Sequence, residues 1–215
     1  VWGDCGYAIK TIYDMILGTH NSATGGQLLW WLRPLAWVIN PTSKCQNRTI
    51  QEQLQDGVKV FNLQVAFVNG KWRFTHGLAI YTEDVFETLA MMKACATKEE
   101  PIYFQLYLDK CFWCKQDEIA FIELVSIIRA ELLEDGIFMM FDPWIEGTNE
   151  YFRMGNVFET ELMEEHYWTL SWGKMYGKTW KDKLPLPKRH AKKFNAKYKN
   201  NCKSKYLMLD FYNYE

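Results

Sequence analysis

Two histidines are the residues in this sequence best suited to proton transfer, and each follows a short run rich in β-forming residues. His20 follows 14–19 and His76 follows 71–75. Because the reference pKa of histidine is about 6.5, two adjacent imidazoles can act as general base and general acid near neutral pH. We expect both runs to be parallel strands that present the histidines at the mouth of an α/β barrel, where catalytic groups lie. The alternative is that each histidine is an ordinary capping or core residue.

The residues around and between the histidines form an ordered set of motifs. Gly18-Thr19-His20-Asn21-Ser22 is the first, and residues 50–65 read as a short helix, a glycine stop and a strand. His76-Gly77 then ends the second histidine run. This order resembles the X domain of phosphatidylinositol-specific phospholipase C, which has a Gly-(Thr/Ser)-His-(Asp/Asn)-Ser turn, a helix–strand unit and a strand ending in His-Gly. The resemblance covers roughly residues 10–110 and 204–213.

The resemblance implies a TIM-barrel-like phosphodiesterase fold of the α/β class, in a single domain spanning residues 1–215. A full barrel of this kind takes about 250 residues, so we expect this one to be trimmed or incomplete in its C-terminal half. Hydrophobic periodicity predicts helices at 82–96, 116–134 and 157–170, and residues 171–206 are expected to be irregular. No apolar run reaches the roughly 20 residues that span a bilayer, so we do not expect an integral membrane protein.

The resemblance also implies a reaction. In that family the 2-hydroxyl of inositol attacks the phosphorus, which releases diacylglycerol and a cyclic inositol phosphate. By position, His20 would be the base and His76 the acid. Asp210, in the run that resembles the last strand of the family, would orient or support them electrostatically.

The positions that would stabilise charge on the phosphate depart from the family pattern. Bacterial members use an arginine there, and calcium-dependent members use acidic residues with an Asn after the first histidine. Here the positions read Asn21, Asn62, Gln64 and Tyr107, which are candidate phosphate-binding residues but carry no charge. Since calcium sites draw affinity from carboxylates, we expect no cofactor, and calcium only if this altered site still binds it.

These substitutions favour a phospholipase-like scaffold with a degraded active centre, hence a non-catalytic protein that binds a ligand or assembles with itself. A viral occlusion or storage protein is one form of that hypothesis. The alternative is an active phosphatidylinositol phosphodiesterase that uses His20 and His76. A slow enzyme could recruit Arg33, Arg73 or a lysine to replace the missing charge.

Aromatic residues and charge both point to surfaces that bind partners. The stretch 28–37 contains three Trp and follows the first histidine; it is either a lipid-facing rim, a buried first helix or an oligomer interface. Residues 174–205 contain 12 Lys and Arg against one acid, while the rest of the chain carries −12. Such a dipole suits self-association or peripheral contact with an anionic membrane or phosphoinositide, and a solvated segment is the third reading. No motif accompanies the charge, so we do not expect nucleic-acid binding.

Six cysteines and the sequon at Asn47 favour disulfides and glycosylation, and therefore secretion, another oxidising compartment or a place within a viral assembly. Cys111 and Cys114 form a CxxC motif, which suits half of a zinc site or a redox pair. A second cysteine or histidine pair at ligand spacing is missing from the sequence, which argues against zinc.

Overall fold

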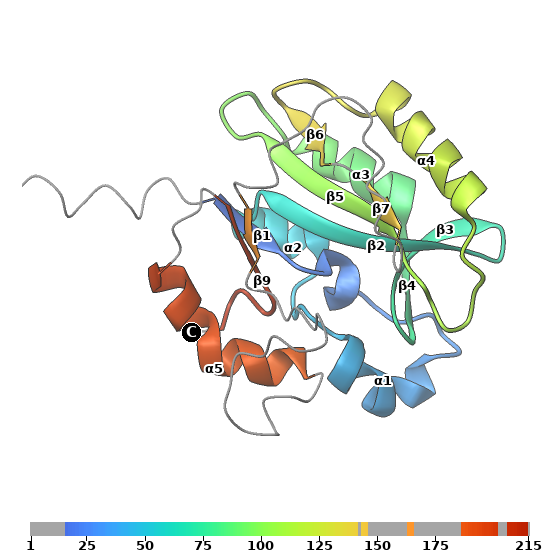
Figure 1. Ribbon diagram of the computed structural model, residues 1–215, viewed down its shortest axis with the longest axis horizontal. Helices are drawn as coiled ribbons and strands as arrows, with labels where there is room; N and C mark the ends of the chain where they lie inside the picture. Colours follow the sequence, from blue (N-terminus) through green and yellow to red (C-terminus); the bar gives the residue numbers. More distant parts are fainter. Residues whose placement is uncertain (1–15, 142, 146–162, 166–185, 202–205, 215) are drawn as a thin grey trace, which may run out of the picture.

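The computed structural model describes residues 16–141, 143–145, 163–165, 186–201 and 206–214 (Figure 1). Short 3-10 helices lie at Ser22–Gly25 and Arg33–Leu35. The helices are α1 (Ala36–Ser43), α2 (Ile50–Gln55), α3 (Val85–Ala94), α4 (Glu118–Glu131) and α5 (Pro187–Asn201). The strands are β1 (Ile16–Thr19), β2 (Val60–Val68), β3 (Lys71–His76), β4 (Ala79–Asp84), β5 (Ile102–Leu108), β6 (Phe138–Met140), β7 (Trp144–Ile145), β8 (Met163–Glu165) and β9 (Tyr206–Leu209).

One mixed sheet carries the fold. Its strands follow the order β4-β3-β2-β1-β9-β8, and β5 pairs with β2, β6 and β7. All pairs among β8, β9, β1, β2, β5, β6 and β7 are parallel, and the sheet curls into part of a barrel. In Figure 1, α4 lies at the upper right of the sheet, α3 lies behind β5, and α1 and α5 lie below the sheet. The expected α/β fold, a trimmed TIM-barrel-like one, is therefore confirmed.

The helix, glycine stop and strand expected between the histidines are present. Thr49 and Glu52 form a capping box at the start of α2, which supplies partners for its free backbone N–H groups. Gly57 follows the helix at φ +85°, a conformation that glycine adopts without steric cost, and β2 then begins. Burial of its side chains stabilises β2, since every residue of the strand except Phe67 is buried.

The prediction that His76 ends a parallel strand is wrong, because β3 runs antiparallel to β2. β2 is nine residues long and extends well beyond the end of β1, because Thr19, the last residue of β1, pairs with Phe61, the second residue of β2. The same edge of β2 is then taken by the returning β3, with Phe74 opposite Val65. The two histidines consequently meet where β1 ends and β3 arrives.

Three predicted helical or irregular segments need correction. Thr82–Asp84 belong to β4, where they continue the β3–β4 hairpin, so α3 starts at Val85 rather than at residue 82. Within the predicted helix 157–170, the described residues form strand β8, which pairs with β9. The segment expected to be irregular contains the Lys-rich helix α5, whose described buried residues are Pro187, His190, Ala191 and Asn195. The predicted helix 116–134 is confirmed as α4.

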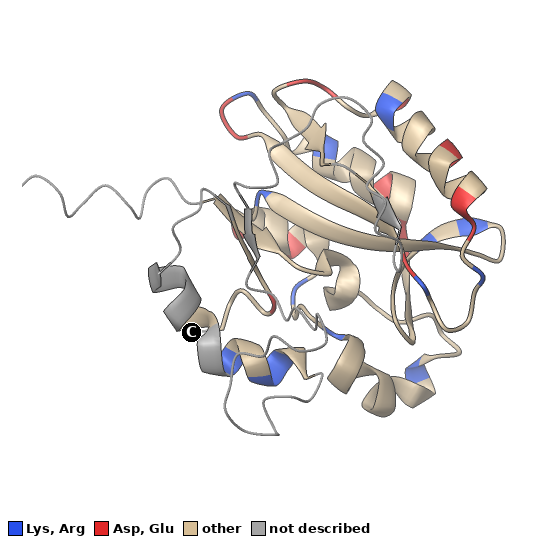
Figure 2. Cartoon of the chain, viewed as in Figure 1, with Lys and Arg blue, Asp and Glu red and all other residues tan. Residues whose placement is uncertain are grey.

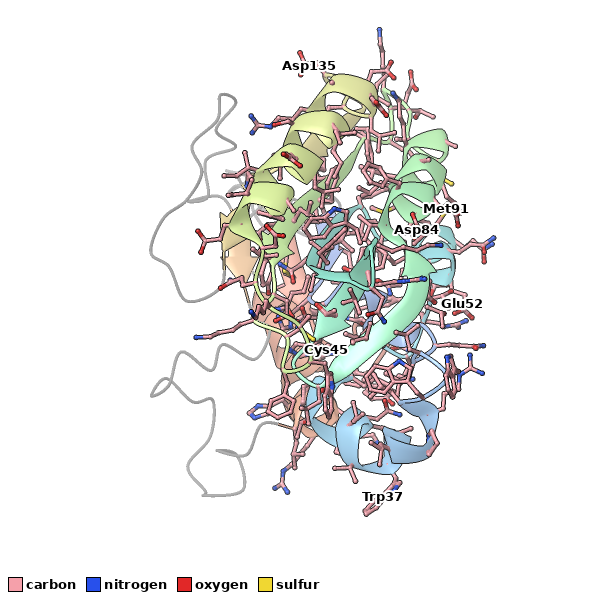
Figure 3. The ribbon with its side chains drawn as sticks, turned by 90° about the vertical axis from the view of Figure 1, so that its right-hand side faces the viewer. Trp37, Cys45, Glu52, Asp84, Met91 and Asp135 are labelled. Atoms are coloured by element: carbon pink, nitrogen blue, oxygen red, sulfur yellow. The ribbon has the colours of Figure 1, made fainter. Side chains whose placement is uncertain are left out.

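The aromatic stretch after the first histidine does not form a buried helix. Trp30 and Trp37 are 76% and 79% exposed, and Leu35 and Val38 are exposed beside them. Trp37 projects from the tip of α1, at the end of the molecule opposite Asp135 (Figure 3). None of the described helices combines the length and apolar character needed to cross a membrane.

Candidate active site

The interior of the curled sheet is organised in layers, because alternate residues of a strand point to the same face. The lower layer consists of Gly18, Val60, Tyr103 and Met208, which are neighbours in register. A Cβ on Gly18 would lie 2.9 Å from Val60 Cβ, so only glycine fits there without a shift. The residue two positions after each of these belongs to a second, polar layer, which consists of His20, Asn62, Gln105 and Asp210. This layer is the candidate active site.

His20 is paired with Asp210 inside this layer. His20 Nδ1 lies 2.8 Å from Asp210 Oδ1, and the two residues are 5% and 3% exposed. Gln46 fixes the strands that carry them, since its Nε2 donates to the backbone oxygens of His20 (2.9 Å) and Leu209 (2.8 Å). A carboxylate that accepts from Nδ1–H leaves the Nε2 of the imidazole as a base.

His76 is oriented in the same way by a different acceptor. Its Nδ1 lies 2.7 Å from the backbone oxygen of Ser43, the last residue of α1. The rings of His20 and His76 stand edge to face with centroids 6.2 Å apart. The structure therefore brings the predicted base and acid together, even though the strands that carry them run in opposite directions.

Asn21 connects the two histidines. Its Nδ2 lies 2.9 Å from His20 Nε2 and 3.1 Å from His76 Nε2, and its backbone N–H donates to Asn62 Oδ1 at 3.1 Å. The backbone of Asn21 has a φ of 45°, a left-handed conformation that Asn tolerates better than most residues. An Asn21 amide that donates to both Nε2 atoms requires those nitrogens to be acceptors, which matches the Nδ1–H tautomer that Asp210 and Ser43 O favour.

Three of the four positions expected to bind phosphate, Asn62, Gln64 and Tyr107, take part in two neutral hydrogen-bonded pairs between β2 and β5. Asn62 Nδ2 donates to Gln105 Oε1 at 2.9 Å, and Gln64 Nε2 donates to the Tyr107 hydroxyl at 2.6 Å. Sequence reasoning missed Gln105. The signal for it was available, since Gln105 is the polar residue two positions before Tyr107 in an otherwise apolar or aromatic strand.

The arginines that might have restored positive charge are engaged elsewhere. Arg33 donates to the backbone oxygen of Leu28 at 3.0 Å, and Arg73 donates to that of Thr82. Lys59 Nζ lies 2.7 Å from Glu100 Oε2. Both residues precede the strands β2 and β5, so this ion pair lies at the end of the sheet far from the site. The Lys59 side chain therefore points away from the site, as expected from strand alternation. The candidate charge replacements at Arg33 and Arg73 are therefore not found at the site.

Calcium does not fit the residues at these positions. None of the four expected ligands is a carboxylate, and calcium sites draw much of their affinity from carboxylates. Asn62 Oδ1 already accepts from Asn21 N–H. The nearby carboxylate of Asp210 is paired with His20. Ligand atoms of His20, Cys45 and Asp210 do lie within 4.8 Å of one another. Burial and the nearby Asp210 charge, however, raise the pKa of the Cys45 thiol well above its usual value, and a metal-bound cysteine must be deprotonated.

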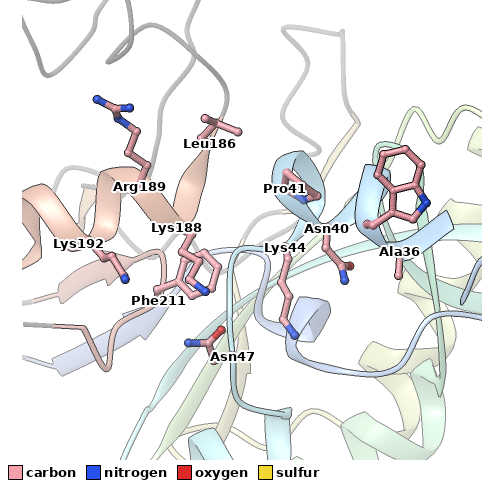
Figure 4. A pocket seen from close by; sticks show the side chains of 11 residues that line it. Ala36, Asn40, Pro41, Lys44, Asn47, Leu186, Lys188, Arg189, Lys192 and Phe211 are labelled. Atoms are coloured by element: carbon pink, nitrogen blue, oxygen red, sulfur yellow. The ribbon is translucent and has the colours of Figure 1, made fainter. Parts of the chain in front are cut away.

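A basic pocket opens beside the site (Figure 4). It has a volume of about 720 Å³ and lies between α1 and α5. Lys44 and Trp37 line one wall, Lys188 and Lys192 line the other, and Phe211, next to Asp210, lies between them. Figure 2 shows the basic residues of α5 on this side of the molecule. Sequence reasoning placed a basic segment here but did not predict its helix or the pocket.

The expected disulfides are not found in the described residues. Cys45, Cys95, Cys111 and Cys114 are all free thiols, and Cys5 and Cys202 lie outside the described residues. The sequon residue Asn47 is exposed and donates to the Tyr214 hydroxyl at 2.7 Å.

The comparisons with known proteins agree with this architecture. No protein-family model and no curated protein sequence matches the chain. Solved structures do match. A point mutant of the phosphatidylinositol-specific phospholipase C of Staphylococcus aureus has a TM-score of 0.58 and 15% identity, covering 93% of this chain and 86% of that one. The enzyme of Listeria monocytogenes has a TM-score of 0.55 and 13% identity, covering 91% and 87%. The chain thus has a fold like that of phosphatidylinositol-specific phospholipase C.

Proposed function

We propose that this protein binds the headgroup of phosphatidylinositol, or of a related inositol phospholipid, between His20 and His76 without efficient turnover. One observation carries the proposal: an ordered acid–base pair shares its site with neutral amides at the positions where phosphate charge must be stabilised. Asn62 is bonded to Gln105 and Gln64 to Tyr107. Removal of one charge-stabilising group typically costs about a hundredfold or more in rate.

Buried acceptors in the site suit a ligand rich in hydroxyl groups. Asn21 Oδ1 and Gln64 Oε1 are buried, and neither accepts a hydrogen bond from any residue that the structure describes. An unpaired buried polar atom costs about 1–3 kcal/mol, so a ligand that donates to these oxygens recovers that free energy. The hydroxyls of an inositol ring are donors of this kind.

Contact with a membrane surface is the second part of the proposal. Lys44, Lys188 and Lys192 line the pocket beside the site, and the exposed Trp37 lies at its edge. Each suitably placed cation contributes about 1 kcal/mol on an anionic membrane, and Trp favours the boundary between lipid and water. The pocket would then hold the protein on the membrane with the site facing the headgroups.

Titration with glycerophosphoinositol, a soluble phosphodiester, tests the binding site. We expect the imidazole NMR signals of His20 and His76 to shift, and the His190 signal, from a residue outside the site, to stay in place. No shift at either site histidine up to about 10 mM would limit the binding free energy to less than about 3 kcal/mol and contradict the proposal.

An active phosphodiesterase is the second candidate, and the orientation of the histidines favours it. With Nδ1 of His20 on Asp210 and Nδ1 of His76 on Ser43, both Nε2 atoms face one point, 2.9 and 3.1 Å from Asn21 Nδ2. In such an enzyme His20 would take the inositol hydroxyl proton, and a protonated His76 would give one to the leaving glycerol oxygen. Loss of turnover in His20→Ala would support this candidate.

Self-association is a further proposal for the exposed aromatic surface. Trp30, Trp37 and Phe112 are more than 70% exposed, and exposed aromatic clusters are typical of contact surfaces. A sedimentation coefficient that rises with protein concentration is the expected result, and one independent of concentration contradicts it. The described residues give no support to an occlusion or storage role.

A further inference from the structure

The CxxC motif forms a tight turn between β5 and α4 that the proposed function does not use (Figure 1). Cys111 is buried and Cys114 is partly buried, and both are free thiols. Cys114 N–H donates to Cys111 O at 3.4 Å, so the four residues form a β-turn. The first and fourth Cα atoms of a β-turn lie within about 7 Å, which overlaps the range of about 4.4–6.8 Å found in disulfides.

The Cys114 thiol lies against Cys111, since its Sγ is 4.0 Å from the backbone oxygen of Cys111. A hydrogen bond from the Cys114 thiol lowers the pKa of Cys111 to about 7 and raises that of Cys114. Near neutral pH a substantial fraction of the Cys111 side chains would therefore be thiolate, the reactive form in thiol–disulfide exchange. Cys95, which is exposed and far along the chain from any such partner, offers a comparison within the same protein.

Zinc is a poor occupant for this pair. In the described part of the chain, the one cluster of three potential metal ligands is His20, Cys45 and Asp210, and it contains neither Cys111 nor Cys114. Structural zinc sites need four ligands in tetrahedral geometry. Of the two interpretations that the sequence allows for this motif, a zinc half-site and a redox pair, these observations favour the redox pair.

We propose that Cys111 and Cys114 are a reversible dithiol–disulfide site that exchanges with low-molecular-weight disulfides such as oxidised glutathione. The thiolate of the pair attacks one sulfur of glutathione disulfide, forming a mixed disulfide and releasing one glutathione thiolate. The second cysteine loses its proton, attacks the protein sulfur of the mixed disulfide and releases the second glutathione. Two protein thiols are oxidised, and one glutathione disulfide is reduced to two glutathione molecules.

The turn contacts Gly77 and Leu78, which directly follow His76 at the end of β3. Phe112 N–H donates to Gly77 O at 3.2 Å, and Trp113 Nε1–H donates to Leu78 O at 2.8 Å. Trp113 also stands edge to face on Trp31, with centroids 5.8 Å apart. Closure of the disulfide changes the turn that makes these contacts, so tryptophan fluorescence should report it.

The test uses the full reduced chain, equilibrated with mixtures of reduced and oxidised glutathione and mapped by mass spectrometry after acid quenching. We expect the peptide carrying Cys111 and Cys114 to lose two hydrogen atoms, reversibly, in the wild type and in Cys95→Ser. Cys111→Ser and Cys114→Ser should stop at a glutathione adduct or remain reduced. A pair that stays reduced while Cys95 is glutathionylated, or that bonds to other cysteines instead, overturns the proposal.

A second measurement needs no variant. Alkylation of wild-type Cys111 by iodoacetamide should accelerate as the pH rises and reach half of its maximal rate near pH 7, because the thiol loses its proton there. Cys95 serves as the internal reference. A half-maximal rate for Cys111 near pH 9, at or above that of Cys95, overturns the proposed reactivity.

Discussion

Asn195 holds the backbone of Asp210 in place. Its Nδ2 donates to the backbone oxygens of Asp210 and Phe211, each at 2.9 Å, from a buried position in α5. Phe211 has a φ of 43°, a conformation that a bulky side chain rarely adopts and that costs about 1–3 kcal/mol. The basic C-terminal segment thus positions the acidic residue that pairs with His20.

Replacing Asn195 with Ala should destabilise the protein. The change removes one donor from each of two carbonyl oxygens, and Phe211 O keeps its hydrogen bond from Tyr214 N–H. We expect a cost of about 1–3 kcal/mol of unfolding free energy, which lowers Tm by about 2–4 °C for each kcal/mol. Asn213→Ala, at an exposed position nearby, is the matched control. Equal Tm values for the two variants, measured by calorimetry, would contradict this role.

The hydrogen bonds predict one tautomer for both site histidines. His20 donates from Nδ1 to Asp210 and His76 donates from Nδ1 to Ser43 O, so ¹⁵N spectra at pH 8 should show Nδ1–H imidazoles. Asp210→Ala should change the tautomer balance of His20 and leave that of His76 unchanged. An Nε2–H tautomer at His20 in the wild type would contradict the hydrogen bond from His20 Nδ1 to Asp210.

Gln64→Arg should raise the release of inositol phosphate about tenfold to a hundredfold above the background expected for both the wild type and His20→Ala, since it places a cation in the layer above the histidines. The measurement is release of water-soluble inositol phosphate from vesicles. Gln51→Arg, on the exposed face of α2, adds the same charge to the surface without altering the site. An equal increase in both variants would mean that the charge acts through membrane binding instead.

Trp37→Ala should weaken binding to vesicles that contain phosphatidylinositol by about tenfold, because it removes the aromatic edge of the basic pocket. Trp30 is equally exposed but does not line the pocket, so Trp30→Ala should bind more nearly as the wild type does. Co-sedimentation at low and high salt separates this apolar contribution from that of the lysines, which salt screens. A larger loss of vesicle binding in Trp30→Ala than in Trp37→Ala would show that the membrane-binding surface lies away from the pocket.

The sequence was informative where local chemistry decides structure. The capped helix, glycine and buried strand at 50–65 follow from their own residues, and the positions of His20, Asn62 and Asp210 follow from their places on strands. The direction of β3 was not predictable, because it depends on how far β2 extends beyond β1, a tertiary property. Helix α5 was missed because its buried face has few apolar residues to mark it.

Roles that depend on side chains remote in the sequence were also missed. Gln46 and Asn195 donate to backbone oxygens of Leu209, the last residue of β9, and of Asp210, which follows it, more than a dozen positions away, and neither belongs to a recognisable motif. Gln105 could have been found from strand alternation, because it follows Tyr103 of the apolar layer by two positions.

Release of inositol phosphate from phosphatidylinositol vesicles, by the wild type and by His20→Ala, tests the central claim most directly. Each protein is assayed with calcium and with a chelator, and vesicle binding is measured in the same samples. We predict that the wild type binds the vesicles and releases no more inositol phosphate than His20→Ala under either condition. Release by the wild type that disappears in His20→Ala would contradict the claim and establish a phospholipase.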